Sequence, residues 1–168
     1  GYDLIINSLT QVIKKYQNVH YLIVGSGNDF ERVQRLITKK KLEKYVTLTG
    51  FIRDDELPSM YNFSDIYAMP STNEGFGIVF IEALLSGIPV LGGNIDGTKD
   101  ALNGGKLGIL VNPYNSQELI NNLVLMLDDK LPKHLSDPIT LRKNCIKKHN
   151  SAAFYSKVNL VVNAIITN

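Results

Sequence analysis

Two glutamates that stand eight positions apart, Glu74 and Glu82, are the residues of this chain best suited to chemistry. Glu74 lies in a polar turn broken by Gly75 and Gly77, and Glu82 lies in the apolar run that follows, which has the pattern of a helix. A helix start offers free backbone N–H groups and the positive end of the helix dipole, and both suit an anion. Eight helical residues rise about 12 Å, roughly the length of a sugar, a diphosphate and a ribose laid along one loop. Two carboxylates with an anion cradle between them therefore predict a nucleotide-sugar site.

The elements that must position these glutamates alternate between strand and helix along the chain. Alternation of this kind favours an α/β fold: a Rossmann-like, doubly wound and mostly parallel sheet with helices on both faces. Ligands of such sheets bind beyond the carboxyl ends of the strands, where all the glycine-rich turns of this chain are expected. The pattern predicts strands at 20–24, 46–49, 65–69, 89–91 and 108–111, with helices near 4–13, 30–37, 57–61, 78–86 and 115–126.

The sequence divides into two parts. Residues 1–128 are predicted to form the Rossmann-like nucleotide-sugar-binding domain. Residues 129–168 are predicted to form a loop and helices that pack on this domain or towards a domain that precedes it. The last of these helices carries more apolar residues than a solvated helix needs: Phe154, Tyr155, Val158, Val161 and Val162. Because the chain begins with Gly1 inside a helical pattern, we expect it to be a fragment of a longer protein.

Composition excludes several classes of protein. The 168 residues suffice for one domain with a substantial core, and a net charge of +2 does not favour binding to nucleic acid. The single cysteine, Cys145, allows no intramolecular disulfide and no spacing of residues suits a metal site. No apolar run is long enough to span a membrane. We therefore expect a cytoplasmic protein that needs no metal or other cofactor.

Several motifs follow one another in the order and spacing of a known family: 24–27 (VGSG), 50–52 (GFI), 70–82 (PSTNEGFGIVFIE), 87–90 (GIPV) and 108–113 (GILVNP). Over residues 1–128 the chain resembles the C-terminal, donor-binding domain of the retaining nucleotide-sugar glycosyltransferases of family 4. These are the group 1 transferases, which have the GT-B fold of two domains.

The resemblance implies roles for individual residues. Glu82 is expected to bind the ribose hydroxyls, and Glu74, the implied catalytic residue, is expected to approach the reacting face of the donor sugar. Gly25 would let the nucleotide come close. The base is expected to lie against Gly50, Phe51 and Ile52, and the sugar and diphosphate against the backbone N–H groups of Gly75, Phe76, Gly77, Ile78 and Val79.

The resemblance also implies an activity and partners for the whole protein. It would transfer a hexose from a nucleotide-sugar donor to a saccharide, lipid or other acceptor with retention of configuration, in glycan or polysaccharide biosynthesis. It would work in the cytoplasm, with possible peripheral contact with the cytoplasmic face of a membrane. The family's basic pair that neutralises the diphosphate, its first strand and its N-terminal domain have no counterpart in the chain, so the chain alone is expected to be inactive.

Other interpretations stay open at this point. Glu82 could face solvent, and Glu74 could serve only the helix dipole. The chain could be a nucleotide-binding domain without turnover, or part of a GT-B sugar-nucleotide epimerase, which should show a histidine and further carboxylates in the interdomain cleft. A dehydrogenase is disfavoured, because Phe30 occupies the last glycine position of a G-x-G-x-x-G motif. Asn94, Asp96 and Asp100 are further candidates for donor or acceptor contacts.

Overall fold

The computed structural model describes residues 1–150, and the last predicted helix lies outside the described residues. Strands and helices alternate as expected, and every strand pairing is parallel. The strands are β1 (Tyr21–Ile23), β2 (Val46–Leu48), β3 (Tyr67–Met69), β4 (Val90–Gly93) and β5 (Ile109–Val111). The helices are α1 (Tyr2–Val12), α2 (Phe30–Lys40), α3 (Leu57–Asn62), α4 (Ile78–Leu85), α5 (Thr98–Ala101), α6 (Ser116–Leu127), α7 (Lys133–Ser136) and α8 (Pro138–His149).

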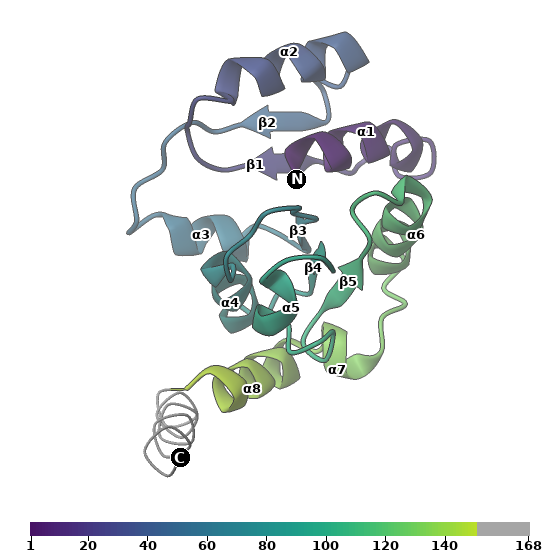
Figure 1. The fold of residues 1–168 in the computed structure, drawn as a ribbon. Helices are drawn as coiled ribbons and strands as arrows, with labels where there is room; N and C mark the ends of the chain where they lie inside the picture. The colour runs from purple at the N-terminus through teal and green to yellow at the C-terminus, as the bar shows by residue number, and fades with distance from the viewer. Residues whose placement is uncertain (151–168) are drawn as a thin grey trace, which may run out of the picture.

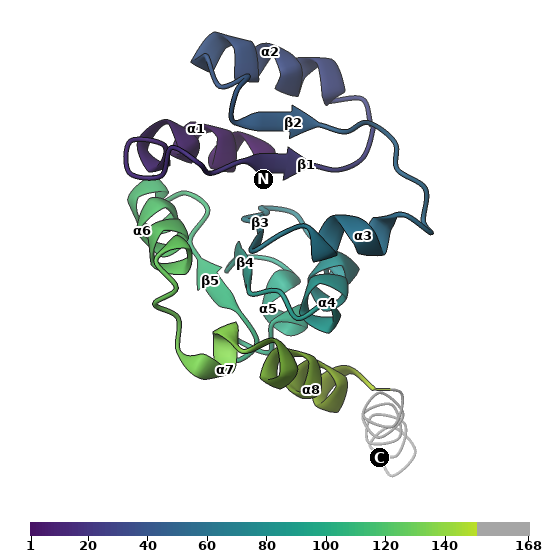
Figure 2. The ribbon, with the colours of Figure 1, turned by 180° about the vertical axis from the view of Figure 1, so that it is seen from behind.

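The strands form two sheets rather than the single sheet that we expected. β1 pairs with β2, and β4 lies between β3 and β5, but among residues 1–150 no strand joins β1 to β3. Figures 1 and 2 show β1, β2 and α2 as one layer, and β3, β4 and β5 with helices α3 to α8 as another. Helix α1 lies between the two layers.

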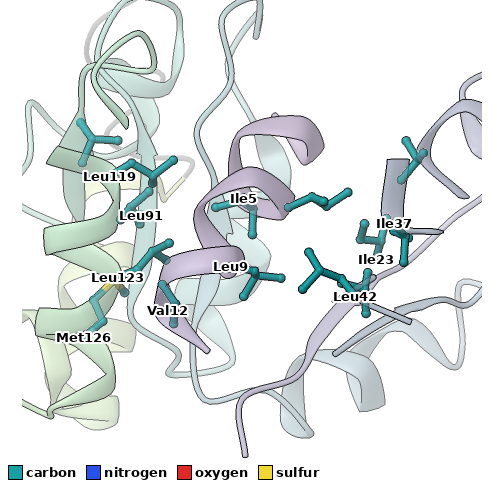
Figure 3. Packing of buried hydrophobic residues seen from close by; sticks show 14 residues of the cluster. Ile5, Leu9, Val12, Ile23, Ile37, Leu42, Leu91, Leu119, Leu123 and Met126 are labelled. Atoms are coloured by element: carbon teal, nitrogen blue, oxygen red, sulfur yellow. The ribbon is translucent and has the colours of Figure 1, made fainter. Parts of the chain in front are cut away.

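Helix α1 holds the two layers together through its buried side chains. Figure 3 shows Ile5, Leu9 and Val12 between residues of the first layer, such as Ile23, and residues of α6, such as Leu123. All five belong to one buried cluster. Burying an aliphatic side chain of this size is worth about 1.5–3 kcal/mol. In the described part of the chain, no backbone hydrogen bonds between strands join the two sheets, so the apolar side chains of α1 hold them together instead.

A second buried cluster lies under the glutamate segment and joins α4, β4, α5 and α8. It contains Phe80, Leu84, Val90, Leu102 and Leu141, all buried. Helix α8 begins at an Asp137 cap, whose carboxylate accepts the Thr140 N–H at 2.8 Å. The polar segment 128–137, expected to be a loop, contains the short helix α7. Four helical residues are too few to show a helical period, which explains why the sequence did not indicate it.

Candidate functional site

The turn that carries Glu74 is tied by its backbone to the loop after β4. The Glu74 N–H donates to Asp96 Oδ2 at 2.8 Å, and the Gly97 N–H donates to the Glu74 carbonyl at 2.9 Å. The second carboxylate oxygen of Asp96 accepts the Thr98 N–H at 3.1 Å. We call the two segments, 70–77 and 93–98, the packed loops. The three hydrogen bonds fix the backbone position of Glu74 beyond the carboxyl end of β3.

Close contact between backbones reinforces these hydrogen bonds. A Cβ atom added at Gly97 would overlap the carbonyl group of Gly75, and one added at Gly93 would overlap the carbonyl of Ser71. Both neighbours are backbone atoms, which cannot move without moving the loop. The packed loops can therefore approach this closely only because glycine stands at positions 93 and 97.

Helix α4 starts at the end of the Glu74 turn with its N-terminus uncapped by any side chain. Its N-cap residue is Gly77, which adopts a left-handed conformation with φ of 87° and makes no side-chain cap hydrogen bond. The first helical residue, Ile78, is 68% exposed. An exposed helix start after a glycine turn provides N–H donors and a positive dipole end to an anion from solution.

Glu82 lies one helical turn further along α4, and its carboxylate accepts a hydrogen bond from the Tyr61 hydroxyl at 2.8 Å. The Tyr61 ring packs against the Tyr67 ring with centroids 5.9 Å apart. Burial, and then the hydrogen bond to Glu82, raise the pKa of Tyr61 above its usual value, so its hydroxyl remains a donor at all ordinary pH values. The half-buried Glu82 is therefore held by α3 and does not project freely into solvent.

The loops after β1 and β2 form the other part of the glycine-rich edge. We call segments 24–27 and 49–52 the open loops. The Gly25 N–H donates to the Gly50 carbonyl at 3.0 Å, and neither glycine has an atom within 4 Å of the place where a Cβ would stand. A hollow of about 110 Å³ lies beside segment 24–27, and its lining includes Tyr2, Ser26 and Phe30. The glycines of the open loops thus have free space beside them, whereas two glycines of the packed loops are in contact with a neighbouring backbone.

The structure therefore brings the predicted site residues together in two groups. Gly25, Gly50, Phe51 and Ile52 belong to the open loops; Glu74, Gly75, Phe76, Gly77, Ile78, Val79 and Glu82 belong to the packed loops and the α4 helix that follows them. The start of α1 lies between the groups: a Cβ at Gly1 would stand 3.0 Å from the Pro70 carbonyl oxygen, and Tyr2 lines the hollow. A larger hollow of about 530 Å³ lies at the opposite edge, before β3 and β4, and includes Asp65 and Pro89 in its lining.

Sequence reasoning missed the roles of Asp96 and Tyr61. Asp96 was a candidate for ligand contacts, and in the structure its carboxylate accepts two backbone hydrogen bonds that the sequence did not indicate. Burial acts to raise the pKa of Asp96, but the hydrogen bonds from Thr98 and from the Glu74 backbone outweigh it and lower the pKa below its usual value. The Asp96-Gly97-Thr98 sequence, in which an aspartate precedes a helix start, is a signal that could have indicated this turn.

Among residues 1–150, no group of three histidine, cysteine or carboxylate side chains is placed to hold a metal ion. Of the described histidines, His20 lies 2.8 Å from Thr47 Oγ1, and His149 lies 2.9 Å from the Ala101 carbonyl oxygen. The His149 ring also packs edge-on against Phe76 of the Glu74 turn, with centroids 5.8 Å apart. The end of α8 is therefore close to the packed loops.

With this geometry in place, comparison with known proteins identifies the class of the protein. The model of the family "Glycosyl transferases group 1" matches residues 1–151, and the chain belongs to that family. A phosphatidylinositol monomannoside mannosyltransferase of Mycobacterium tuberculosis, described as GDP-mannose-dependent, is 29% identical over 137 residues, which are 77% of this chain. The O-antigen biosynthesis glycosyltransferase WclY of Escherichia coli is 31% identical over 156 residues, which are 93% of the chain.

Solved structures agree with this assignment. Anabaena HepE, crystallised with UDP, superposes with a TM-score of 0.77 over 96% of this chain at 25% identity. The matches cover 36% of the mycobacterial relative, 37% of WclY and 44% of HepE. The chain thus spans about a third of the length of the curated relatives.

Proposed function

We propose that this chain is the donor-binding domain of a glycosyltransferase that moves a hexose from a nucleotide-sugar to a saccharide, lipid or other acceptor. The observation that carries the proposal is the Glu74 turn. Its backbone is fixed by Asp96 and Gly97 at the start of α4, and Glu82 is held one turn away. Membership of the group 1 family supports it. The relatives named above are a mannosyltransferase, a transferase of O-antigen biosynthesis and a protein crystallised with UDP.

In this proposal the donor lies along the glycine-rich edge. The ribose hydroxyls donate to Glu82, and the diphosphate accepts from backbone N–H groups at 75–79, where α4 begins. Glu74 is the catalytic residue that contacts the donor sugar, and the base lies against Gly50, Phe51 and Ile52 of the open loops. Charge that develops on the leaving diphosphate is stabilised by the preorganised N–H groups. Neither metal nor other cofactor takes part, and the sugar is transferred with retention.

A second domain is part of the proposal, because the described edge supplies only one wall of a cleft. Several large apolar side chains at this edge face solvent: Phe51 is 73% exposed, Ile78 68%, and Tyr114, just after β5, 78%. A facing N-terminal domain would cover them and would contribute the acceptor site. The 168-residue chain alone should then catalyse no transfer, and product formed by the purified chain from any donor would contradict this.

We also propose that the protein works in the cytoplasm, in contact with a membrane surface. The single cysteine, Cys145, is buried and unpaired, which fits a reducing compartment. Among the described residues, no helix is long and apolar enough to cross a bilayer.

The test uses two glutamate variants of the full-length protein, measured by calorimetric binding of nucleoside diphosphate and by initial rates. Glu82→Ala should weaken nucleotide binding at least tenfold, because two charge-assisted hydrogen bonds of about 1.5–3 kcal/mol each are lost. Glu74→Ala should bind the nucleoside diphosphate as the wild type does but turn over far more slowly, because its contacts are to the sugar.

Two controls separate these roles from structural effects. Tyr61→Phe removes the hydroxyl that holds Glu82 but keeps the carboxylate, so it should cost far less binding than Glu82→Ala. Glu43→Ala, an exposed glutamate after α2, should change neither measurement. If Glu82→Ala binds nucleotide like the wild type, or if Tyr61→Phe reproduces its whole effect, the ribose assignment is wrong.

A further inference from the structure

The outward face of α8 carries a stripe of two isoleucines flanked by cations. Ile139 is 79% exposed and Ile146 51% exposed, and both lie seven positions apart on the same side of the helix. Three exposed cations lie between or next to these isoleucines in the sequence: Arg142, Lys143 and Lys147. The opposite side of α8 buries other residues against α4. Figures 1 and 2 show α8 along one outer edge of the molecule.

Positive charge is concentrated in this part of the chain. Residues 133–149 contain five lysines and arginines and one carboxylate, Asp137, which gives a net charge of +4. The whole chain has a net charge of +2, so the remaining residues together carry −2. Within residues 1–150, no carboxylate forms an ion pair with Arg142, Lys143 or Lys147. These three cations therefore remain available to an external anion.

The combination of charge and apolar surface selects among possible partners. Cations alone would bind any polyanion. Two exposed isoleucines between them would not be removed from water by contact with the phosphate backbone of a nucleic acid. A helix with apolar residues in the middle of its outward face and lysines or arginines at the sides is suited to lie in the headgroup region of an anionic bilayer. There the isoleucines leave water and the cations meet lipid phosphates. We propose that the α8 stripe is a docking surface for an anionic membrane.

This orientation places the candidate site next to the bilayer. α8 runs antiparallel to α4: its start lies against Gly87, and its end lies against Phe76, whose ring is 5.8 Å from that of His149. Arg142 is held against the end of α4 by a 2.7 Å hydrogen bond from its Nε to the Leu85 carbonyl. A bilayer in contact with the stripe therefore lies across α8 from α4, the helix that carries Glu82 and follows the Glu74 turn. The docking surface does not depend on the proposed transfer reaction.

The test measures binding of the full-length protein to vesicles by flotation. The vesicles contain phosphatidylcholine alone, or phosphatidylcholine with about a third replaced by phosphatidylglycerol. The wild type should bind the anionic vesicles and not the neutral ones, and high salt should release it. Lys143→Glu/Lys147→Glu should bind at least about 25-fold more weakly, since each cation near such a surface contributes about fivefold. Ile139→Gln/Ile146→Gln should lose about tenfold, because apolar area stays in water.

Matched variants make the result specific to α8. Lys39→Glu/Lys40→Glu changes the net charge by the same amount as Lys143→Glu/Lys147→Glu, but at the exposed end of α2. Phe63→Gln removes an apolar side chain that is 80% exposed at the end of α3. Both should bind vesicles like the wild type.

The proposal is overturned if the wild type does not prefer anionic vesicles, or if Lys39→Glu/Lys40→Glu loses as much binding as Lys143→Glu/Lys147→Glu. It is also overturned if duplex DNA competes as well as anionic lipid while the isoleucine variant binds normally, because the stripe would then be a general polyanion surface. Nucleoside diphosphate binding, measured in parallel, should be the same in all four variants.

Discussion

The open loops after β1 and β2 and the packed loops after β3 and β4 are both rich in glycine, but their glycines have different surroundings. At Gly25 and Gly50 a Cβ atom would meet nothing within 4 Å, and the conformation, with φ of 118° and 70°, is what favours glycine. At Gly93 and Gly97 a Cβ would overlap a neighbouring backbone carbonyl. Glycine-rich turns that look alike in sequence thus leave room for a ligand in one region and let two loops touch in the other.

This difference assigns separate tasks to the two regions in the proposed site. The packed loops fix the position of Glu74, so substitutions there should damage stability and function together. The glycines of the open loops have free space beside them, where the nucleotide is proposed to bind, so substitutions there should damage binding more than stability. Each prediction below changes one glycine or one hydrogen bond and can confirm or contradict this division.

The largest effect is expected for Gly97→Ala. The added methyl group must displace the Gly75 carbonyl and with it the Glu74 turn, and overpacking of this kind costs about 3 kcal/mol. For a chain of this size the midpoint of thermal unfolding should fall by roughly 6–12 °C. Gly27→Ala, with open space around it and no left-handed backbone, is the control and should unfold like the wild type. Equal midpoints for both variants would contradict the description of the packed loops.

A smaller loss of stability, but a clear loss of binding, is expected for Gly25→Ala. Alanine at φ of 118° costs about 1–2 kcal/mol of backbone strain, and its methyl group would occupy free space beside Gly25, where the nucleotide is proposed to come close. Nucleoside diphosphate binding should weaken about tenfold, which calorimetry would measure. Gly104→Ala is the matched control, because Gly104 also has a positive φ, of 64°, with open space around it, but lies in the loop before β5. If both variants bind nucleotide equally well, the open loops do not line the site.

The strands and long helices were predictable from the sequence because each buries an apolar run of a recognisable period. The strand expected at 46–49 is β2, Val46–Leu48, and the helix expected near 115–126 is α6, Ser116–Leu127. The α/β class and the membership of the group 1 family were also predicted correctly. The division into two sheets was not predicted, since strand pairing depends on partners that local patterns do not identify.

The contacts that hold the candidate site escaped sequence reasoning for a different reason. Asp96 binds the backbone of Glu74, which stands 22 positions earlier, and Tyr61 binds Glu82, 21 positions later. A side chain that bonds to a distant backbone leaves no periodic signal, and Tyr61 has the same helical pattern whether its hydroxyl is bonded or free. The glutamates themselves were identifiable because their spacing is local. The ligand roles of these glutamates remain predictions.

The smallest effect is expected for Asp96→Asn, which tests how much the hydrogen bonds add to the backbone contact of the packed loops. An asparagine oxygen can still accept one N–H, but its NH₂ group cannot accept the other. Because Asp96 is only half-buried and solvent screens its charge, the loss at neutral pH should be about 1 kcal/mol or less. If Asp96→Asn costs as much as Gly97→Ala, hydrogen bonds and not backbone contact hold these loops together.

The pH dependence makes this last prediction specific to the carboxylate. Because the pKa of Asp96 is lower in the folded protein, its ionised form stabilises the fold at pH values above the ordinary aspartate pKa, near 4, and this stabilisation is lost as the pH falls through the lowered folded value. The difference in unfolding free energy between the wild type and Asp96→Asn, measured by denaturant unfolding, should therefore be constant above about pH 5 and shrink below about pH 4. A difference that is independent of pH would mean that the shape of the side chain, and not its charge, holds the Glu74 turn in place.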